Sequence, residues 1–386
     1  MNILLDISHP AHVHLLRNVY TQLVNDGHKV YVIAKPTKAI TDLLDLYHIP
    51  FVPLGGNRDS MLGKAFLQIS NFFYLLYFVV KHRIDIGVHG MTMAWVSRLT
   101  KMHSILTDDD DDAVEPLYAR YAHPFADVIL SPEGTKRKSK KTIYVPSYHE
   151  LAYLHPNEFT PDPSVLNDAG LKQGEPYFVL RFNAFKAHHD VGVVGLTIEN
   201  KRRLVEYLKT KGKVFITTER DIDDEFLPYQ LKVSPDKAHS LMYYATMFIG
   251  DSQTMTSEAA VLGTPAIRCN TFVGRIHYLE EEEHRYCLTY GFRPEQSELM
   301  FQKIAELLSM PNLKQEWQQR RERMLNDKID YTSFITWFIE NYPVSVQAVR
   351  TNSAEWLKQN MGGGIRHNSA IIIILHHNYA NFKHAA

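Results

Sequence analysis

The sequence contains few cysteines and lacks a long apolar run. Its 386 residues include only Cys269 and Cys287, which cannot form a disulfide framework and lack the spacing of metal ligands. The longest apolar run, residues 72–80, falls well short of the roughly 18 residues that span a bilayer. No signal sequence is visible, because Asp6 interrupts the first apolar run after Leu5. These absences predict a protein of the reducing cytoplasm.

The charge balance excludes a general attraction to nucleic acid. The chain has 42 Lys and Arg and 43 Asp and Glu, which gives a net charge of -1. Neither polyanions nor basic partners are therefore indicated. With 45% apolar and 22% charged residues, the composition is that of a globular protein with a sizeable core. The length indicates two to three domains.

Apolar stretches of strand length alternate with helical stretches along the chain. Strands are predicted at residues 2–7, 29–34, 51–53, 85–88, 104–106, 127–130, 177–181, 213–217, 247–249 and 266–268. This alternation predicts the α/β class, with parallel sheets covered by helices on both faces. A stretch rich in Pro, Asn and Asp, residues 146–176, marks the linker between two halves. We therefore predict domains at residues 1–155 and 156–345, followed by an appendage at residues 346–386.

A strand–helix–strand unit at residues 247–268 predicts a site for an anion. The residues that follow its first strand are polar and suit a tight turn and a helix start: Asp251, Ser252, Gln253 and Thr254. The N–H groups of such a helix start face the carboxyl ends of the strands, where open α/β sheets bind anions and nucleotides. Glu258, about one and a half turns further on, can accept two hydrogen bonds from a vicinal diol such as a ribose. The alternative interpretation of Glu258 is a solvated surface acid.

The loop after the strand at residues 177–181 carries a second set of charged groups. Arg181 and Lys186 offer hydrogen-bond donors to a pyrophosphate, and an arginine can bind phosphate oxygens in a bidentate manner. His189 stands beside Asp190 in the same loop, so these two residues are candidates for acid–base chemistry. The alternative is a structural salt bridge.

Three histidines lie in and just after the first loop. His9, His12 and His14 follow the strand at residues 2–7, and the loop has no glycine-rich phosphate fingerprint. A histidine at the end of a strand suits a general base, because its ordinary pKa is near 6.5. The group also suggests a metal, but no further ligand residues accompany it, so no metal is predicted. Helix capping and surface positions are the remaining alternatives.

Two charged runs are interpreted as solvated segments. Residues 108–112 are five aspartates in a row, which repel one another and are typical of a solvated loop. The alternative is a divalent metal site with Asp108 pointing inward. Residues 280–283 are four glutamates on a predicted helix, most simply a solvated face.

An apolar helix is predicted from Lys64 to Arg83, with basic residues at both ends. We expect it to be buried or to face a partner. The alternative is a helix that lies in a membrane interface, which its basic flanks and its aromatic residues would permit. These aromatic residues are Phe72, Phe73, Tyr74 and Tyr77.

Four segments resemble the bacterial and archaeal family called domain of unknown function 354. They are residues 6–14 (DISHPAHVH), 148–156 (YHELAYLHP), 180–192 and 250–265 (GDSQTMTSEAAVLGTP). The resemblance covers roughly residues 1 to 345. That family is grouped with GT-B glycosyltransferases and is similar to UDP-N-acetylglucosamine 2-epimerase and to the GlcNAc transferase of peptidoglycan synthesis. The resemblance implies two Rossmann-like domains whose parallel sheets face across a cleft.

The resemblance also implies roles for individual residues. The nucleotide sugar would be held mainly by the C-terminal domain, with the diphosphate at Ser252, Gln253 and Thr254 and the ribose at Glu258. The histidine that faces the acceptor would be His9 or His14.

The implied function is glycosyl transfer, of the hexosyl- or N-acetylhexosaminyltransferase class, in surface polysaccharide or glycolipid assembly. The donor would be a nucleotide diphosphate sugar such as a UDP-sugar, and the acceptor a glycan or a lipid-linked molecule. No cofactor is expected, because helix dipoles and a cation can carry the charge of the leaving diphosphate. One alternative is a 2-epimerase of UDP-N-acetylhexosamine, for which His189 and Asp190 are candidates. Another is a non-catalytic protein that binds nucleotide sugars. The expected location is the cytoplasm, with peripheral contact at the inner face of the membrane through Lys64 to Arg83 as an alternative.

Overall fold

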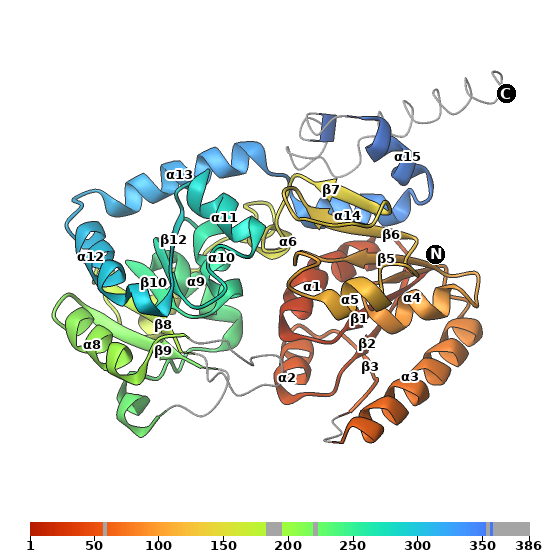
Figure 1. Ribbon diagram of the computed structural model, residues 1–386, viewed down its shortest axis with the longest axis horizontal. Coiled ribbons are helices and arrows are strands. Elements are labelled where there is room, and N and C mark those ends of the chain that lie inside the picture. The colour runs from red at the N-terminus through yellow and green to blue at the C-terminus, as the bar shows by residue number, and fades with distance from the viewer. Residues whose placement is uncertain (57–59, 183–194, 219–222, 353–355, 358–386) are drawn as a thin grey trace. The chain divides into compact units, whose positions relative to one another are not determined.

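The chain divides into two compact units, which are described separately (Figure 1). The structure is a computed structural model that describes residues 1–56, 60–182, 195–218, 223–352 and 356–357. The N-terminal unit contains Met1–Glu158 and the segment from Asp327 onward. The second unit is Phe159–Asn326.

The N-terminal unit is built on a seven-stranded sheet in the order β3-β2-β1-β4-β5-β6-β7. Its strands are β1 (Asn2–Ile7), β2 (Lys29–Ala34), β3 (Val52–Pro53), β4 (Ile86–Val88), β5 (His103–Thr107), β6 (Val128–Pro132) and β7 (Thr142–Val145). All pairings are parallel, with Leu5 of β1 opposite Val32 on one side and Val88 on the other. A central strand of this kind is covered on both faces, so Ile3 and Leu4 are fully buried.

Helices from both ends of the chain cover this sheet. They are α1 (Pro10–Asn25), α2 (Lys38–Leu46), α3 (Met61–His82), α4 (Met91–Ser97), α5 (Pro116–Tyr121), α6 (Leu151–Leu154), α14 (Tyr331–Glu340) and α15 (Val344–Thr351). α1 packs with α2, α6 and α14, and α3 packs with α4. α1 begins where Pro10 occupies the first turn, a position at which proline costs no hydrogen bond.

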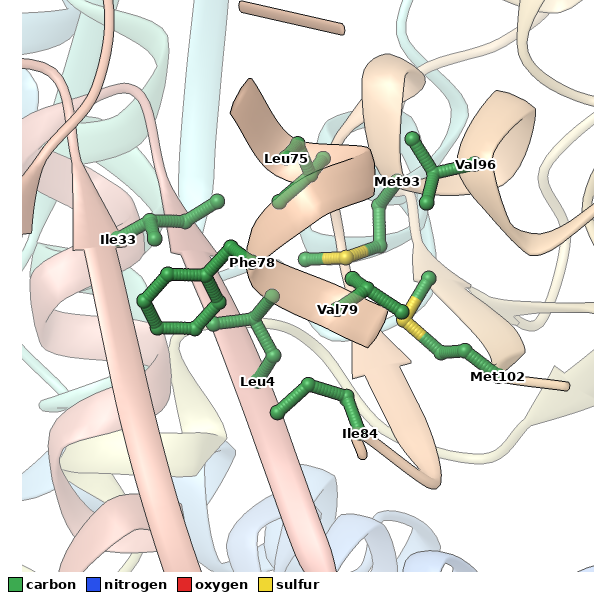
Figure 2. Packing of buried hydrophobic residues seen from close by; sticks show 9 residues of the cluster. All are labelled: Leu4, Ile33, Leu75, Phe78, Val79, Ile84, Met93, Val96 and Met102. Atoms are coloured by element: carbon green, nitrogen blue, oxygen red, sulfur yellow. The ribbon is translucent and has the colours of Figure 1, made fainter. Parts of the chain in front are cut away.

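The inner face of α3 forms part of the core of the N-terminal unit (Figure 2). Leu75, Phe78 and Val79 of α3 are buried against Leu4 of β1 and Ile33 of β2. Within the described residues, the chain has no helix that combines the length and the apolar character needed to cross a membrane.

The second unit is built on a five-stranded sheet in the order β12-β11-β10-β8-β9. Its strands are β8 (Tyr177–Arg181), β9 (Lys213–Thr217), β10 (Met247–Gly250), β11 (Ala266–Cys269) and β12 (Thr289–Phe292), all in parallel pairs. Its helices are α7 (Val165–Asp168), α8 (Ile198–Lys209), α9 (Ala238–Tyr244), α10 (Gln253–Val261), α11 (His277–His284), α12 (Ser297–Leu308) and α13 (Leu313–Asp327), with short 3-10 turns at Asp224–Tyr229, Pro235–Lys237 and Pro294–Gln296.

The structure divides the chain differently from the predicted boundaries at residues 155 and 345. The first break lies after Glu158, and the chain returns to the N-terminal unit at Asp327. The return is held by α14, whose Phe334 and Phe338 are fully buried and whose Thr332 Oγ1 donates to the carbonyl of Ala152 at 2.6 Å. The alternation of strands and helices along the sequence does not reveal that α14 belongs to the N-terminal unit, because an apolar helix near the end of the chain could pack on either sheet.

Each sheet has one point at which the strand order reverses. In the N-terminal unit the chain moves from β1 outward to β3 and then returns to add β4 on the other side of β1. In the second unit the corresponding point lies between β8 and β10. In open parallel sheets, ligands bind outside the carboxyl ends of the strands at such switch points. The residues that follow β1, β4, β8 and β10 are therefore the first to consider as a functional site.

Candidate functional site

At the switch point of the second unit, β8 and β10 come very close. Gly250 at the end of β10 pairs with Arg181 at the end of β8, and the N–H of Asp251 donates to the Arg181 carbonyl at 3.2 Å. A Cβ atom on Gly250 would lie 2.6 Å from that carbonyl oxygen. Only glycine therefore allows the backbone approach that places Arg181 beside the start of α10. Arg181 is buried, and its Nη1 donates to Thr217 Oγ1 at 3.1 Å.

The loop into α10 is fixed by polar contacts. Ser252 is the N-cap residue, and its Oγ accepts a hydrogen bond from the N–H of Met255 at 3.3 Å. Asn270, which follows β11, donates from Nδ2 to the Asp251 carbonyl at 2.9 Å. Gln253 and Thr254 form the first turn of α10, where backbone N–H groups point out of the helix and the helix dipole is positive. The predicted helix start at Ser252 thus lies at the carboxyl edge of the sheet, where an anion can be received.

Glu258 lies on the second turn of α10 and is not a solvated surface acid. Its side chain is only 6% exposed. His239 Nε2, from α9, donates to Glu258 Oε1 at 3.0 Å, and both side chains are buried. The alternative interpretation of Glu258 as a solvated acid is therefore wrong. The hydrogen bond from His239 fixes the orientation of the Glu258 carboxylate.

The expected solvated face at residues 280–283 is also wrong for Glu282. This side chain is fully buried and accepts a hydrogen bond from Ser257 Oγ at 2.5 Å. Arg268 at the end of β11 is likewise buried, 3.4 Å from Glu280 Oε1. The acids of α11 therefore hold α10 and β11 in place.

Two histidines meet at the switch point of the N-terminal unit. His12, on the first turn of α1 after β1, lies with its ring centroid 4.1 Å from that of His89, which follows β4. Nδ1 of His89 lies 2.9 Å from the carbonyl oxygen of Thr107. The same nitrogen lies 3.0 Å from Thr107 Oγ1. Because the carbonyl only accepts, we assign the proton to Nδ1, which leaves Nε2 as a hydrogen-bond acceptor.

Burial keeps this histidine pair neutral. Burial, with the charge of His149 adding to it, lowers the pKa of His89 to about 4. Burial also lowers the pKa of His12 well below its ordinary value, and nearby His89, His9 and His149 lower it further. Both rings are therefore uncharged at neutral pH.

The predicted residues His9 and His14 flank His12 at the start of α1, and the ring centroid of His9 lies 5.8 Å from that of His12. His9 is exposed and caps α1, where its Nδ1 accepts from the N–H of Ala11 at 3.2 Å. The ring of His14 packs against Tyr153, with centroids 5.3 Å apart, and against Tyr47 at 6.0 Å. Of the three histidines, His12 is the one whose ring contacts His89.

The half-buried carboxyl group of Asp6, on β1, lies against Gly90, the residue after His89. Burial raises the pKa of Asp6 to about 7. Gly90, which follows His89, has φ +83, and a Cβ there would lie 1.9 Å from Asp6 Oδ2. Glycine is therefore needed at position 90 for two reasons. It can adopt the left-handed backbone conformation, and it leaves room for the Asp6 carboxyl group.

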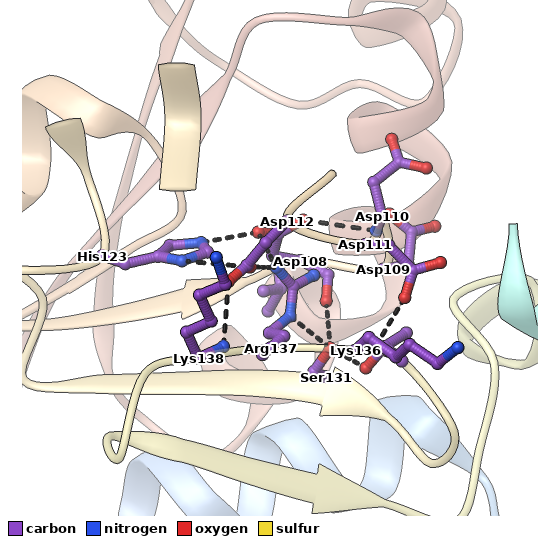
Figure 3. A network of polar contacts seen from close by, with 12 residues as sticks. Asp108, Asp109, Asp110, Asp111, Asp112, His123, Ser131, Lys136, Arg137 and Lys138 are labelled. Atoms are coloured by element: carbon purple, nitrogen blue, oxygen red, sulfur yellow. Dashed lines mark hydrogen bonds and ion pairs between the residues drawn. The ribbon is translucent and has the colours of Figure 1, made fainter. Parts of the chain in front are cut away.

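The aspartate run, residues 108–112, is a folded, charge-paired segment (Figure 3). Asp108 and Asp111 are 7% and 3% exposed, so the expected solvated loop is wrong. Arg137 Nη1 lies 2.7 Å from Asp108 Oδ2 and 3.3 Å from Asp112 Oδ1. His123 Nε2 lies 2.8 Å from the same Asp108 oxygen. The basic segment around Arg137 thus neutralises the aspartates. In the sequence the two segments are separate charged runs, and nothing in the pattern indicates that they pair.

His149 is paired with the aspartate run, and its charge also acts on the histidine pair. Its Nδ1 lies 3.2 Å from Asp109 Oδ2, and its ring stacks on Tyr331 at a centroid distance of 5.4 Å. Burial raises the pKa of Asp109, but the charge of His149 and a hydrogen bond from it outweigh burial and leave the pKa below its usual range. For Asp110, burial and the charge of Asp109 raise the pKa to about 8.

Sequence reasoning did not assign roles to several residues of this cluster. His89, His149 and Asp109 belong to segments that it singled out: His89 follows a predicted strand, His149 lies in the YHELAYLHP motif, and Asp109 lies in the aspartate run. The signal was present, but no spacing in the sequence links the three segments.

Three predicted site residues, Lys186, His189 and Asp190, lie outside the described residues. Over the parts of the chain that the structure describes, there is no group of three or more His, Cys, Asp and Glu side chains that could hold a metal ion.

Solved structures with this fold include two kinds of enzyme. A UDP-N-acetylglucosamine 2-epimerase matches with a TM-score of 0.60 and 13% identity, over 84% of this chain and 94% of that one. The MnaA protein of S. aureus with UDP matches at 0.62 and 11%, over 91% and 98%. A spinosyn rhamnosyltransferase complexed with thymidine diphosphate matches at 0.57 and 14%, over 88% and 100%. At these identities the likeness shows the fold alone.

Two α/β units with parallel sheets, together with these neighbours, define a protein of GT-B-type fold. The chain belongs to the DUF354 family of proteins of unknown function, whose family model matches residues 1–286. An uncharacterized protein of Methanocaldococcus jannaschii is 21% identical over 300 residues, which are 73% of this chain and 86% of that protein. The resemblance and the α/β fold class inferred from the sequence are confirmed.

Proposed function

We propose that the protein is a glycosyltransferase that moves a sugar from a nucleoside diphosphate sugar to a glycan or lipid-linked acceptor, in surface polysaccharide or glycolipid assembly. Support comes from solved structures of this fold that contain UDP or thymidine diphosphate. The observation that carries the proposal is the buried Glu258, on the second turn of a helix that starts at the switch point of the second sheet.

The donor is received at the start of α10. The N–H groups of Gln253 and Thr254 and the guanidinium of Arg181 neutralise the diphosphate, and Ser252 holds the helix start in place. Glu258 accepts hydrogen bonds from the two hydroxyl groups of the ribose, with its carboxylate oriented by His239. The helix dipole and the Arg181 cation thus stabilise the negative charge that develops on the diphosphate as it leaves.

The acid–base group on the acceptor side is the histidine pair His12 and His89. Both are neutral at pH 7, and Nε2 of His89 is oriented to accept a proton because Nδ1 donates to Thr107. The sequence-based candidates for this role were His9 and His14. We assign it to His12 with His89 because these two rings meet at the switch point of the first sheet.

A calorimetric titration of UDP, GDP and TDP into the protein tests the donor site. We expect one of the three to bind, and Glu258→Gln to weaken its binding roughly tenfold, since a hydrogen bond to a charged group is lost. Glu206→Gln is the matched control, because Glu206 is an exposed acid of the same unit. Absence of binding by all three nucleotides and by their sugars, together with no transfer or hydrolysis, would remove the proposal.

The second candidate is a 2-epimerase of UDP-N-acetylhexosamine, favoured by the high coverage of the epimerase structure. An epimerase needs no acceptor, whereas a transferase does. Incubation of UDP-N-acetylglucosamine alone in deuterated water separates the two. Deuterium at C2 of the sugar, with a new epimer in the product, assigns the epimerase. A third outcome, nucleotide binding that depends on Glu258 without any reaction, assigns a binding protein.

A further inference from the structure

Helix α3 has apolar side chains on two opposite faces. Leu75, Phe78 and Val79 are buried in the core (Figure 2). The opposite face carries a stripe of apolar side chains that are 56% to 69% exposed: Phe66, Ile69, Phe73, Tyr77 and Val80. They are spaced by three or four residues, so they form one continuous line on the helix. A helix that is apolar all round is either buried or in contact with a nonaqueous environment.

Neighbouring helices extend this stripe into a broad apolar surface. α3 runs along the edge of the N-terminal unit beside α4 (Figure 1). A groove of about 550 Å³ between α3, α4 and α5 is lined by Ile69, Phe73, Trp95, Leu99 and Phe125, among others. Leu117 and Tyr121 of α5 are also exposed, at 69% and 46%. We call this region the α3 surface. Contiguous exposed apolar patches of this kind mark interaction sites.

The charged residues within the segments that form the α3 surface are all basic. Residues 61–83, 91–103 and 116–126, which form it, contain no Asp or Glu although the whole chain has 43. The same segments contain the basic residues Lys64, Lys81, Arg83, Arg98, Lys101 and Arg120.

Three acids, Asp85, Glu115 and Asp127, border the α3 surface, against six basic residues within it, so the region keeps a net positive charge. Asp127 is paired with Arg98 at 2.6 Å, and Asp85 accepts from the N–H of Asn2 at 2.7 Å. Glu115 precedes α5. The other four described cations, Lys81, Arg83, Lys101 and Arg120, are exposed. An apolar centre with a basic border is complementary to a layer of anionic headgroups over hydrocarbon.

We propose that the α3 surface binds the face of a membrane that contains anionic lipid, with α3 lying in the plane of the interface. Phe66, Ile69 and Phe73 enter the region between headgroups and acyl chains. The amphipathic rings of Tyr77, Trp95 and Tyr121 lie at the level of the headgroups, where such side chains are enriched. The lysines and arginines at the border contact lipid phosphates. This inference does not depend on the proposed function.

Co-sedimentation with vesicles tests the proposal. The probes are vesicles of phosphatidylcholine with phosphatidylglycerol, and vesicles of phosphatidylcholine alone. We expect the full chain to bind the anionic vesicles and to be released by added salt, because screening weakens attraction between exposed charges. The double variant Ile69→Ser with Phe73→Ser should reduce the bound fraction roughly tenfold, since two inserted apolar side chains are lost. Both residues are exposed, so the fold should be kept, which circular dichroism checks.

Matched controls come from the second unit. Leu227→Ser with Leu299→Ser removes two apolar side chains that are 45% and 52% exposed, and should leave vesicle binding unchanged. Lys81→Gln with Lys101→Gln should weaken binding and flatten its salt dependence, whereas Lys172→Gln with Lys232→Gln should not. All four lysines are exposed.

Three results would overturn the proposal. The first is failure of the wild-type chain to bind anionic vesicles at low salt. The second is vesicle binding that the Ile69→Ser and Phe73→Ser changes leave intact. The third is a dimer in analytical ultracentrifugation that Phe73→Ser dissociates while no vesicle is bound, which would assign the α3 surface to a second copy of the chain. Nucleotide binding through Glu258 should be the same for all these variants, so failure of one proposal is distinguishable from failure of the other.

Discussion

The rings of His12 and His89 meet edge to face, with centroids 4.1 Å apart, although one follows β1 and the other follows β4. The contact exists because β1 and β4 are neighbours in the sheet and both end at the same edge. It places two neutral imidazoles where the strand order reverses.

The buried state of His89 should make the protein sensitive to acid. The unfolded chain takes up a proton at His89 near the ordinary pKa of 6.5, whereas the folded chain does so only near 4. The contribution of His89 to stability is thus fully present above pH 6.5. As the pH falls from 6.5 to about 4, it is lost, and the free energy of unfolding decreases by about 3 kcal/mol. Urea unfolding across this range should show a smaller loss of stability for His89→Gln than for the wild type.

Asp6 acts in the opposite direction. Its pKa is raised to about 7, so its contribution to stability is present below pH 3.8 and is lost as the pH rises to about 7. The double variant with Asp6→Asn separates the two effects.

Gly90 should tolerate no side chain. Gly90→Ala places a Cβ 1.9 Å from Asp6 Oδ2 and forces a left-handed backbone on alanine, so we expect a loss of more than about 3 kcal/mol in the free energy of unfolding. Gly27→Ala is the control, because Gly27 has the same φ of +83 with no atom within 4 Å of a Cβ. It should cost only about 1 kcal/mol. Equal losses in chemical denaturation would contradict the prediction.

Arg137 should be essential for the stability of the N-terminal unit. Arg137→Met leaves the buried Asp108 and the half-buried Asp112 without this cation, which should cost about 3 to 5 kcal/mol. The control is Lys38→Met, which breaks an ion pair with Asp42 in which both side chains are more than half exposed. That change should stay within about 0.5 kcal/mol. Thermal unfolding of the two variants provides the comparison, and a stable Arg137→Met protein would show that the aspartates do not need this cation.

His239 should act as a positioning residue for Glu258 if the proposed function is right. His239→Leu removes the donor to Glu258 Oε1 and should weaken nucleotide binding roughly tenfold. His239→Gln retains an N–H donor and should recover part of the affinity. Calorimetric Kd values for the same nucleotide, measured on the wild type and both variants, test this prediction. If His239→Leu binds as tightly as the wild type while Glu258→Gln does not, His239 has only a packing role.

The return of the chain to the first unit can be tested through Phe338. Phe338→Ala removes a fully buried ring of α14 and should cost about 3 to 5 kcal/mol. Amide hydrogen exchange followed by mass spectrometry should show faster exchange in α1 and α6, which pack with α14, and unchanged exchange in β8 to β12. Faster exchange confined to the second unit would instead support the predicted boundary at residue 345.

Much of the local structure follows from the sequence. The predicted strands at residues 2–7, 29–34, 177–181 and 213–217 match β1, β2, β8 and β9 residue for residue. Two strands, β7 (Thr142–Val145) and β12 (Thr289–Phe292), were missed. Both are four residues long at the edge of a sheet, and pairing with a neighbouring strand decides their conformation more than their own apolar pattern does.

The candidate site was predictable only in part. The helix start at Ser252 could be located because turn residues and an N-cap are local signals. The burial of Glu258 could not, since it depends on His239 of another helix. Our proposal of His12 in place of His9 and His14 rests on His89, which reaches His12 through the pairing of β1 with β4.

The sequence by itself determined the α/β class, most strand and helix positions, and the resemblance to the family, because these depend on residues close together along the chain. The tertiary structure alone decided that α14 returns to the first unit, that Arg137 neutralises the aspartate run, and that His12 meets His89. Each of these is a contact between distant segments, whose partners are chosen by the packing of the whole unit and by the need to pair buried charge.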